Sequence, residues 1–177
     1  PYLIRSQNVL MNYLRLSDAA RITEETHQQM SRTRVWVGDV LLNITGASIG
    51  RVAWVKALDG PANVHQHVCI IRPNVALVES SFLSVCLSMP SMQAVINGIQ
   101  TGASRQALNH VQVRGMKLPV PPIATQTEFS RQAQMLEECI EQTDAASQTL
   151  DRLWETMMQR AFSGQLTAQW REGHMQE

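Results

Sequence analysis

The sequence predicts a protein of the mixed α/β (α+β) class, a small globular domain with short strands followed by one long, coiled-coil-forming α-helix. Two observations carry this prediction. Residues 1–123 consist of short apolar runs separated by glycine, proline and polar residues, as expected for short strands and helices joined by loops. Residues 124–177 instead repeat apolar side chains at alternating intervals of four and three over more than four heptads. We therefore place the domain boundary between residues 123 and 124.

The formal charge is divided between these two parts. Residues 1–123 contain eleven Lys and Arg against six Asp and Glu, a net charge of +5, whereas residues 124–177 contain four Arg against nine acids, a net charge of −5. A basic domain joined to an acidic helix is typical of a polyanion-binding module whose second part avoids the polyanion. Two independently solvated surfaces would give the same asymmetry and stay open as an alternative.

The three cysteines are far apart in the sequence and form no CxxC motif. This spacing predicts a reduced, cytoplasmic setting without a disulfide framework or a zinc site. The longest apolar stretch, residues 75–87, contains Glu79 and is too short to span a bilayer.

The first half of the globular domain is predicted to start with an extended segment and a short helix. The opening residues PYLIR are interpreted as a strand, and Thr23 is placed to cap a helix that begins with two glutamates. Residues 35–46 and 48–57 then predict a pair of strands with a tight turn at residues 46–48.

The second half is predicted to contain one strand, two helices and a final edge strand. Residues 65–73 are interpreted as the strand, ended by Pro73, and residues 80–89 and 91–99 have helical spacing, with Gly98 or Gly102 ending the second helix. Residues 116–120 predict an edge strand that runs into a proline segment.

The tetrapeptide TGAS occurs twice, at residues 45–48 and 101–104. Neither copy is followed by the lysine of a nucleotide-binding P-loop, and the flanking sequences do not match as an internal repeat would. We interpret both as turns in which glycine permits an unusual φ, and each turn precedes an arginine, Arg51 or Arg105.

The segment TGASRQALNH is dense in groups that bind nucleic acid. Arginine can contact guanine or phosphate with two hydrogen bonds, glutamine and asparagine can do so with adenine, and hydroxyls suit phosphate oxygens. A polar loop that caps the next element is the structural alternative. The residues predicted to contact DNA are Thr45, Ser48, Arg51, His65, Gln66, His67, Thr101, Ser104, Arg105, Gln106, Asn109 and His110.

The acidic part is predicted to be one helix from residue 126 to about residue 162. Thr125 and Glu128 have the spacing of a capping box, and Gly164 supplies a stop. Such a helix is about 55 Å long, too long for the globular domain to cover, so it requires a partner. Thr143 and Ser147 leave the middle of its seam polar. The residues predicted to pair with another helix are Phe129, Leu136, Ile140, Leu150, Trp154 and Met157.

Three segments together resemble the DNA-specificity subunit of type I restriction–modification enzymes: GDVLLNITGASIGRVA, the TGASRQALNH segment with the prolines and Gln126 that follow it, and a heptad helix ending in RAFSGQLT. The resemblance covers residues 35–167. It implies a target-recognition domain at residues 1–123 and a conserved helix at residues 124–177, which acts in dimerisation, as a spacer and in subunit docking.

The resemblance further implies a non-catalytic protein that reads one half of a bipartite double-stranded DNA target. Its expected partners are methyltransferase subunits and, through them, restriction subunits, together with a second copy or the second half of the specificity subunit, which pairs with the helix. No cofactor, metal or membrane is expected. Because a full subunit of this family has two recognition domains and two helices, the chain is expected to be the carboxy-terminal half or a natural half-subunit.

Three other functions explain the sequence less completely. A methyltransferase would need a polar residue before the two prolines and an aromatic residue after them, where Val120 and Ile123 stand. A nuclease would need clustered carboxylates, and a metal site at His65 and His67 lacks a third ligand nearby. A coiled-coil scaffold without DNA specificity explains the helix but not the basic domain, and it stays the main alternative.

Overall fold

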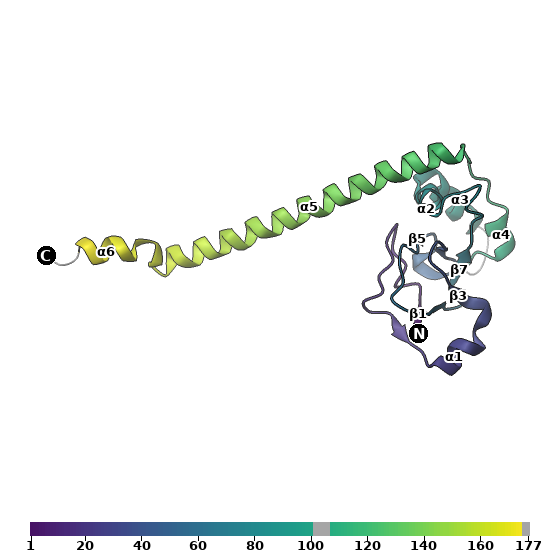
Figure 1. Ribbon diagram of the computed structural model, residues 1–177, viewed down its shortest axis with the longest axis horizontal. Helices are drawn as coiled ribbons and strands as arrows, with labels where there is room; N and C mark the ends of the chain where they lie inside the picture. The colour runs from purple at the N-terminus through teal and green to yellow at the C-terminus, as the bar shows by residue number, and fades with distance from the viewer. Residues whose placement is uncertain (101–106, 175–177) are drawn as a thin grey trace. The chain divides into compact units, whose positions relative to one another are not determined.

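A computed structural model of the chain describes residues 1–100 and 107–174 (Figure 1). The chain divides into two compact units, Pro1–Ser130 and Arg131–Glu177. The first unit contains all the strands and the start of the long helix α5. The mixed α+β class with a long carboxy-terminal helix, as predicted from the sequence, is confirmed.

The first sheet of the globular unit has four short strands in the order β2-β1-β6-β3. Strand β1 (Tyr2–Ile4) pairs antiparallel with β2 (Ala20–Arg21) and parallel with β6 (Ala62–Val64), and β3 (Arg34–Val35) pairs antiparallel with the other side of β6. The extended start at β1 was predicted. Strands β2, β3 and β6 have two or three residues each, too few to produce a recognisable alternation in the sequence.

The second sheet has three antiparallel strands in the order β5-β4-β7. Central strand β4 (Val40–Asn43) is buried at every position and lies between β5 (Val52–Trp54) and β7 (Val68–Ile71). The predicted strand pair with a turn at residues 46–48 is confirmed, and that turn is one turn of 3₁₀-helix, Gly46–Ser48.

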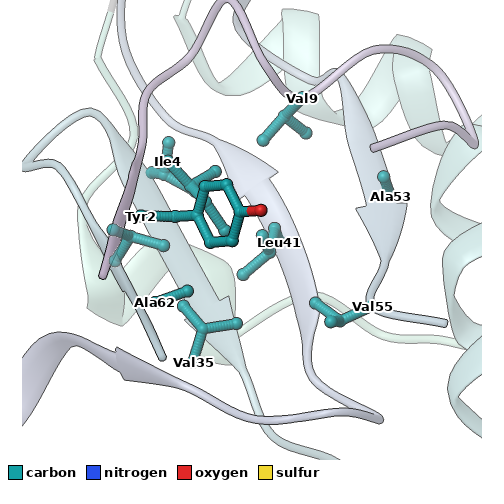
Figure 2. Close-up of a cluster of buried hydrophobic side chains, with 10 residues drawn as sticks. Tyr2, Ile4, Val9, Val35, Leu41, Ala53, Val55 and Ala62 are labelled. Atoms are coloured by element: carbon teal, nitrogen blue, oxygen red, sulfur yellow. The ribbon is translucent and has the colours of Figure 1, made fainter. Parts of the chain in front are cut away.

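Two hydrophobic clusters lie on the two faces of the second sheet, and the first sheet contributes to one of them. Figure 2 shows the first cluster, in which Tyr2 and Ile4 of β1 lie beside Leu41 of β4 and Val55. The second cluster lies between the other face of β4 and two helices, α2 (Ser80–Ser88) and α3 (Pro90–Gln100). Strand β4 therefore buries alternate residues in the two clusters, as the two faces of a central strand require.

A short helix and a 3₁₀ turn complete the first sheet. In α1 (Glu24–Gln29) the Thr23 hydroxyl accepts a hydrogen bond from the Thr26 amide, which confirms the predicted cap. The 3₁₀ turn Ser31–Thr33 follows. Asn63 of β6 binds His27 and the Met30 carbonyl, so the turn between helix and strand is held by buried hydrogen bonds.

One predicted feature of the second half is tested only in part, and another is wrong. Helix α3 continues through Gly98 to Gln100, while Gly102 lies outside the described residues. Residues 116–120 pair with no described strand, because Pro119 inside the segment and Pro121 directly after it supply no amide donor for a ladder. Met116 and Leu118 instead pack their side chains on the second cluster.

Helix α5 (Ile123–Phe162) begins three residues earlier than predicted. The amides of Thr125 and Gln126 already bond to the Pro122 carbonyl, so Thr125 lies in the first turn and does not cap the helix. Two prolines directly before the helix favour this earlier start, because their fixed φ suits a helix amino terminus.

The helix ends where it was predicted to end. Gly164 has a left-handed φ of 75°, which stops α5 and starts the 3₁₀ turn Gln165–Thr167. A last helix, α6 (Ala168–His174), follows; it was not predicted. Among the described residues no single helix combines the length and apolarity needed to cross a bilayer, and α2 with α3 would do so only as a pair bent by 68°.

Candidate nucleic-acid interface

The first TGAS turn lies at the end of the second sheet where β4 stops and β5 begins. Gly46 and Gly50 adopt left-handed φ values of 74° and 85°, so two sharp bends enclose the turn. At Gly50 a side chain would also meet Gln93, whose amide donates to the Gly50 carbonyl. The turn is thus anchored on α3, and it presents an exposed Arg51 and a half-buried Ser48.

The two histidines and Gln66 form the turn that joins β6 to β7. The Val68 amide bonds to the His65 carbonyl at 2.9 Å, and the strand begins only at Val68. The strand predicted for residues 65–73 therefore begins three residues later than expected, and His65 and His67 belong to a turn. Their rings are tilted against each other with centroids 5.0 Å apart, while Gln66 is exposed at the tip.

Thr45 joins these two turns. Its hydroxyl lies 2.6 Å from Nδ1 of His67, and the Ile44 amide bonds to the His67 carbonyl. The structure thereby brings together two predicted site residues that are 22 positions apart in the sequence.

A third segment reaches the same place. Ala107 pairs with Thr45 in an antiparallel bridge, and the Leu108 amide donates to the Ile44 carbonyl at 2.8 Å. The segment that contains the second TGAS therefore ends beside the first one. Four predicted DNA contacts lie outside the described residues, namely Thr101, Ser104, Arg105 and Gln106.

Asn109 and His110 have structural partners that bear on their predicted role. Asn109 caps α4 (His110–Arg114) through a capping box, because its side chain accepts from the Gln112 amide and Gln112 bonds back to its amide. His110 places Nδ1 3.5 Å from the Cys69 sulfur. The signal for this helix was the Asn-x-x-Gln spacing, which the sequence analysis did not use.

A fourth segment, residues 5–7, also reaches this end of the domain. It follows β1, whose last residue accepts a hydrogen bond from the His65 amide, and the buried Asn43 side chain donates to the Ser6 carbonyl. Arg5 and Gln7 were not predicted as site residues, because only the three-dimensional pairing of β1 with β6 brings them near His65.

We use the term recognition edge for the first three segments and this fourth one: residues 45–51, 65–67, 107–110 and 5–7. The edge offers arginine, histidine, hydroxyl and amide groups, which are donors suited to phosphates and base edges. Within residues 1–100 and 107–174 no three His, Cys, Asp or Glu residues gather closely enough to hold a metal ion. Burial raises the pKa of the Cys69 thiol beneath this edge, although the nearby Arg114 charge works against that shift.

The predicted helix-pairing residues do not all have the same surroundings. Phe129 packs edge-on against Phe82 of α2, with ring centroids 5.7 Å apart, so it anchors the start of α5 within the globular unit. The other five are exposed, between 56% and 66% of each side chain: Leu136, Ile140, Leu150, Trp154 and Met157.

Comparison with known proteins gives one consistent family. A model described as the type I restriction modification DNA specificity domain matches residues 5–152. The chain is 31% identical over 172 residues to the type I restriction enzyme EcoBI specificity subunit of Escherichia coli, covering 95% of this chain and 35% of that protein. It is 25% identical over 184 residues to the EcoKI specificity subunit of Escherichia coli strain K12, covering 96% and 38%.

The fold is shared with solved structures. The crystal structure of the HsdS subunit from Thermoanaerobacter tengcongensis matches with a TM-score of 0.69 at 20% identity, over 92% of this chain and 42% of the other. A chain from a study of complex assembly and conformational transition of the type I R-M system matches with a TM-score of 0.65 at 19% identity, over the same shares. The present chain spans about a third of the length of the EcoBI and EcoKI subunits.

Proposed function

The chain belongs to the family of type I restriction modification DNA specificity domains, and from this membership we propose that it reads DNA sequence for a type I restriction–modification enzyme. In this proposal the chain is non-catalytic and recognises one half of a bipartite target. The single observation that supports it best is the convergence of Thr45, His67 and Ala107 at the recognition edge. This convergence brings Ala107, three residues after the second TGAS, to the first TGAS turn.

The recognition edge divides into two kinds of contact in this proposal. Arg51, Arg5 and the two histidines bind phosphates and orient the duplex, a role that needs charge but no base specificity. The residues after the second TGAS, above all Arg105 and Gln106, read base edges, because these two side chains can each form paired hydrogen bonds with one base.

The long helix has a separate role in this proposal. It sets the distance to the second recognition domain and docks methyltransferase subunits, through which restriction subunits join. Its exposed apolar side chains support pairing with another helix, because burying each of them stabilises an assembly by about 1.5–3 kcal/mol. The paired helix comes from the second half of the specificity subunit or from a second copy of this chain.

The functional boundary between recognition and assembly is proposed at residues 123 and 124. The compact globular unit extends a little further, to Ser130, because the first two turns of α5 pack on α2 through Phe129 and Ser130. These turns then belong to the assembly helix by sequence and to the recognition domain by packing.

The test is reconstitution of the specificity subunit with its methyltransferase subunits, followed by mapping of the methylated sequence. Arg105→Ala and Gln106→Ala should reduce methylation at the native target by about tenfold or more, the equivalent of about 1.4 kcal/mol of lost base discrimination. Lys56→Ala is the matched control, because Lys56 follows β5 at the end opposite Arg51. Unchanged methylation in both loop variants would contradict the proposed role of this segment.

The coiled-coil scaffold without DNA specificity is separated from this proposal by the same experiment. A scaffold would assemble with partners through α5 while methylation showed no dependence on the target sequence. The charge of +5 on residues 1–123 favours the DNA-reading function, since a scaffold has no need of a basic domain.

A further inference from the structure

The exposed stripe on α5 is bordered by two different edges. Its core positions are Leu136, Ile140, Thr143, Ser147, Leu150, Trp154 and Met157, which follow one another at alternating steps of four and three and are exposed in the second unit. Within each step of four, the first and the last intervening residues flank the core, and the first is acidic in three consecutive heptads, at Glu137, Asp144 and Asp151. We call these three positions the acidic edge.

The opposite edge carries no charge in the same three heptads. The last residue within each step of four is Cys139, Ala146 or Leu153, and all three are exposed. On the acidic edge, Asp144 and Asp151 are also exposed, and neither forms an ion pair with another described residue. The stripe therefore has one row of acidic residues, of which Asp144 and Asp151 are exposed without an ion pair to a described residue, and one row of small or apolar residues.

In a helix pair, the positions that flank the core determine which partner and which orientation are favoured. When two such helices run antiparallel, like edges face each other, so a second copy of this chain would set carboxylates against carboxylates. When they run parallel, unlike edges face each other, and the carboxylates would lie against cysteine, alanine and leucine. In neither orientation does a second copy offer a cation to the acidic edge.

We propose that the stripe on α5 pairs with a helix of different sequence, one that carries lysine or arginine along the edge facing the acidic edge. A second copy of this chain is a poor occupant. The inference rests on the helix pairing of the proposed function and goes beyond it, because it decides between the two possible partners from charge complementarity.

The test uses the full chain and a charge-reversed variant, E137K/D144K/D151K, studied by sedimentation separately and as an equimolar mixture. In the antiparallel arrangement the mixture should associate at low salt about tenfold more tightly than either protein alone, because there the lysines of the variant meet the carboxylates of the wild-type chain. Added salt should weaken the mixed pair and strengthen self-association of the wild-type chain.

A matched variant, E138K/E141K/E155K, changes the net charge by the same amount at positions away from both edges. Its mixture with the wild-type chain should associate hardly more tightly than the wild-type chain associates with itself. A neutral variant, E137Q/D144N/D151N, provides a second measurement and should self-associate more tightly than the wild-type chain.

Two results would overturn the inference. The first is that the wild-type chain associates with itself as tightly as with the charge-reversed variant, or that it associates equally tightly with the matched variant. The acidic edge then does not select the partner, and only the proposed helix pairing remains. If no mixture associates, the helix does not pair with a helix of its own kind, and that part of the proposed function fails together with the inference.

Discussion

Gln126 joins the start of the long helix to the globular unit, although glutamine is a residue type that is mostly exposed in proteins. It is fully buried, and its amide nitrogen donates to the carbonyls of Leu77 and Pro121, while its oxygen accepts from the Glu79 amide. One side chain thus satisfies three backbone groups where α2, the proline segment and α5 meet. The sequence resemblance drew attention to this glutamine, but its burial follows only from the packing.

Replacing Gln126 with leucine should destabilise the globular unit. Each buried backbone group left without a partner costs about 1–3 kcal/mol, and the substitution removes the partner of three such groups. Chemical denaturation of the full chain measures the change, with Thr127→Ala as the control because Thr127 is the exposed neighbour. An unfolding midpoint equal to that of the control would show that water replaces the glutamine at no cost.

The three cysteines should differ in reactivity toward a thiol reagent. Cys69 and Cys86 are buried, and burial raises the pKa of both thiols, whereas Cys139 is exposed on α5. Since the thiolate is the reactive form, the two buried thiols stay protonated and slow at neutral pH and gain reactivity only as the pH rises toward their raised pKa values. Alkylation followed by mass spectrometry should label Cys139 first, and early labelling of Cys69 would contradict the described packing.

At the scale of elements, the short helix α4 holds residues 107–110 of the recognition edge in place. It has five residues, too few to be stable alone, so the capping box of Asn109 and Gln112 is important to it. The bridge between Thr45 and Ala107 holds the residues just before this cap. The predicted role of Asn109 in binding DNA therefore competes with a structural role that the hydrogen bonds already assign.

Substitutions at Asn109 separate these two roles. Asn109→Ala should weaken α4 by about 1 kcal/mol, while Asn109→Ser retains a capping side chain and should leave it intact. Hydrogen exchange of the amides in residues 111–114 measures the helix, and target methylation measures recognition. If the serine variant keeps α4 protected but loses recognition, Asn109 contacts DNA directly.

Elements with a strong local signal were predictable from the sequence. Helix α5 has a sustained heptad, α1 has a threonine cap, and the β4–β5 pair has two apolar runs around a glycine turn. The two wrongly predicted strand segments share a physical cause. Residues 116–120 and residues 65–67 have strand-like sequences, but they complete no ladder with a described strand. Strand pairing is a long-range property that local alternation does not contain.

The same reason limited the candidate site. Thr45 and His67 were predicted separately, from a turn motif and from residue type, and only their hydrogen bond shows that they belong to one edge. Arg5 has no motif around it, and its nearness to His65 depends on the parallel pairing of β1 with β6.

At the scale of the whole molecule, the two compact units correspond closely to two parts of the sequence with opposite net charge. Residues 1–123 have a net charge of +5 and residues 124–177 a net charge of −5, close to the division into the units Pro1–Ser130 and Arg131–Glu177. The zero net charge of the chain therefore hides two surfaces that respond oppositely to a polyanion. In the proposed function, phosphates therefore bind to the basic domain and not to the acidic helix.

This division predicts that the chain binds duplex DNA weakly and that salt erodes the binding. If the recognition edge neutralises about three or four phosphates, log K falls with log salt at a slope of about −3, or roughly a hundredfold between 50 and 200 mM salt. Arg51→Ala should reduce the magnitude of that slope by about one unit, because one phosphate contact is lost, while Lys56→Ala at the other end of β5 should leave it unchanged. Titration of labelled duplex at several salt concentrations measures all three proteins. Binding that is indifferent to salt, or equal effects of the two substitutions, would mean that phosphates do not dock at this edge.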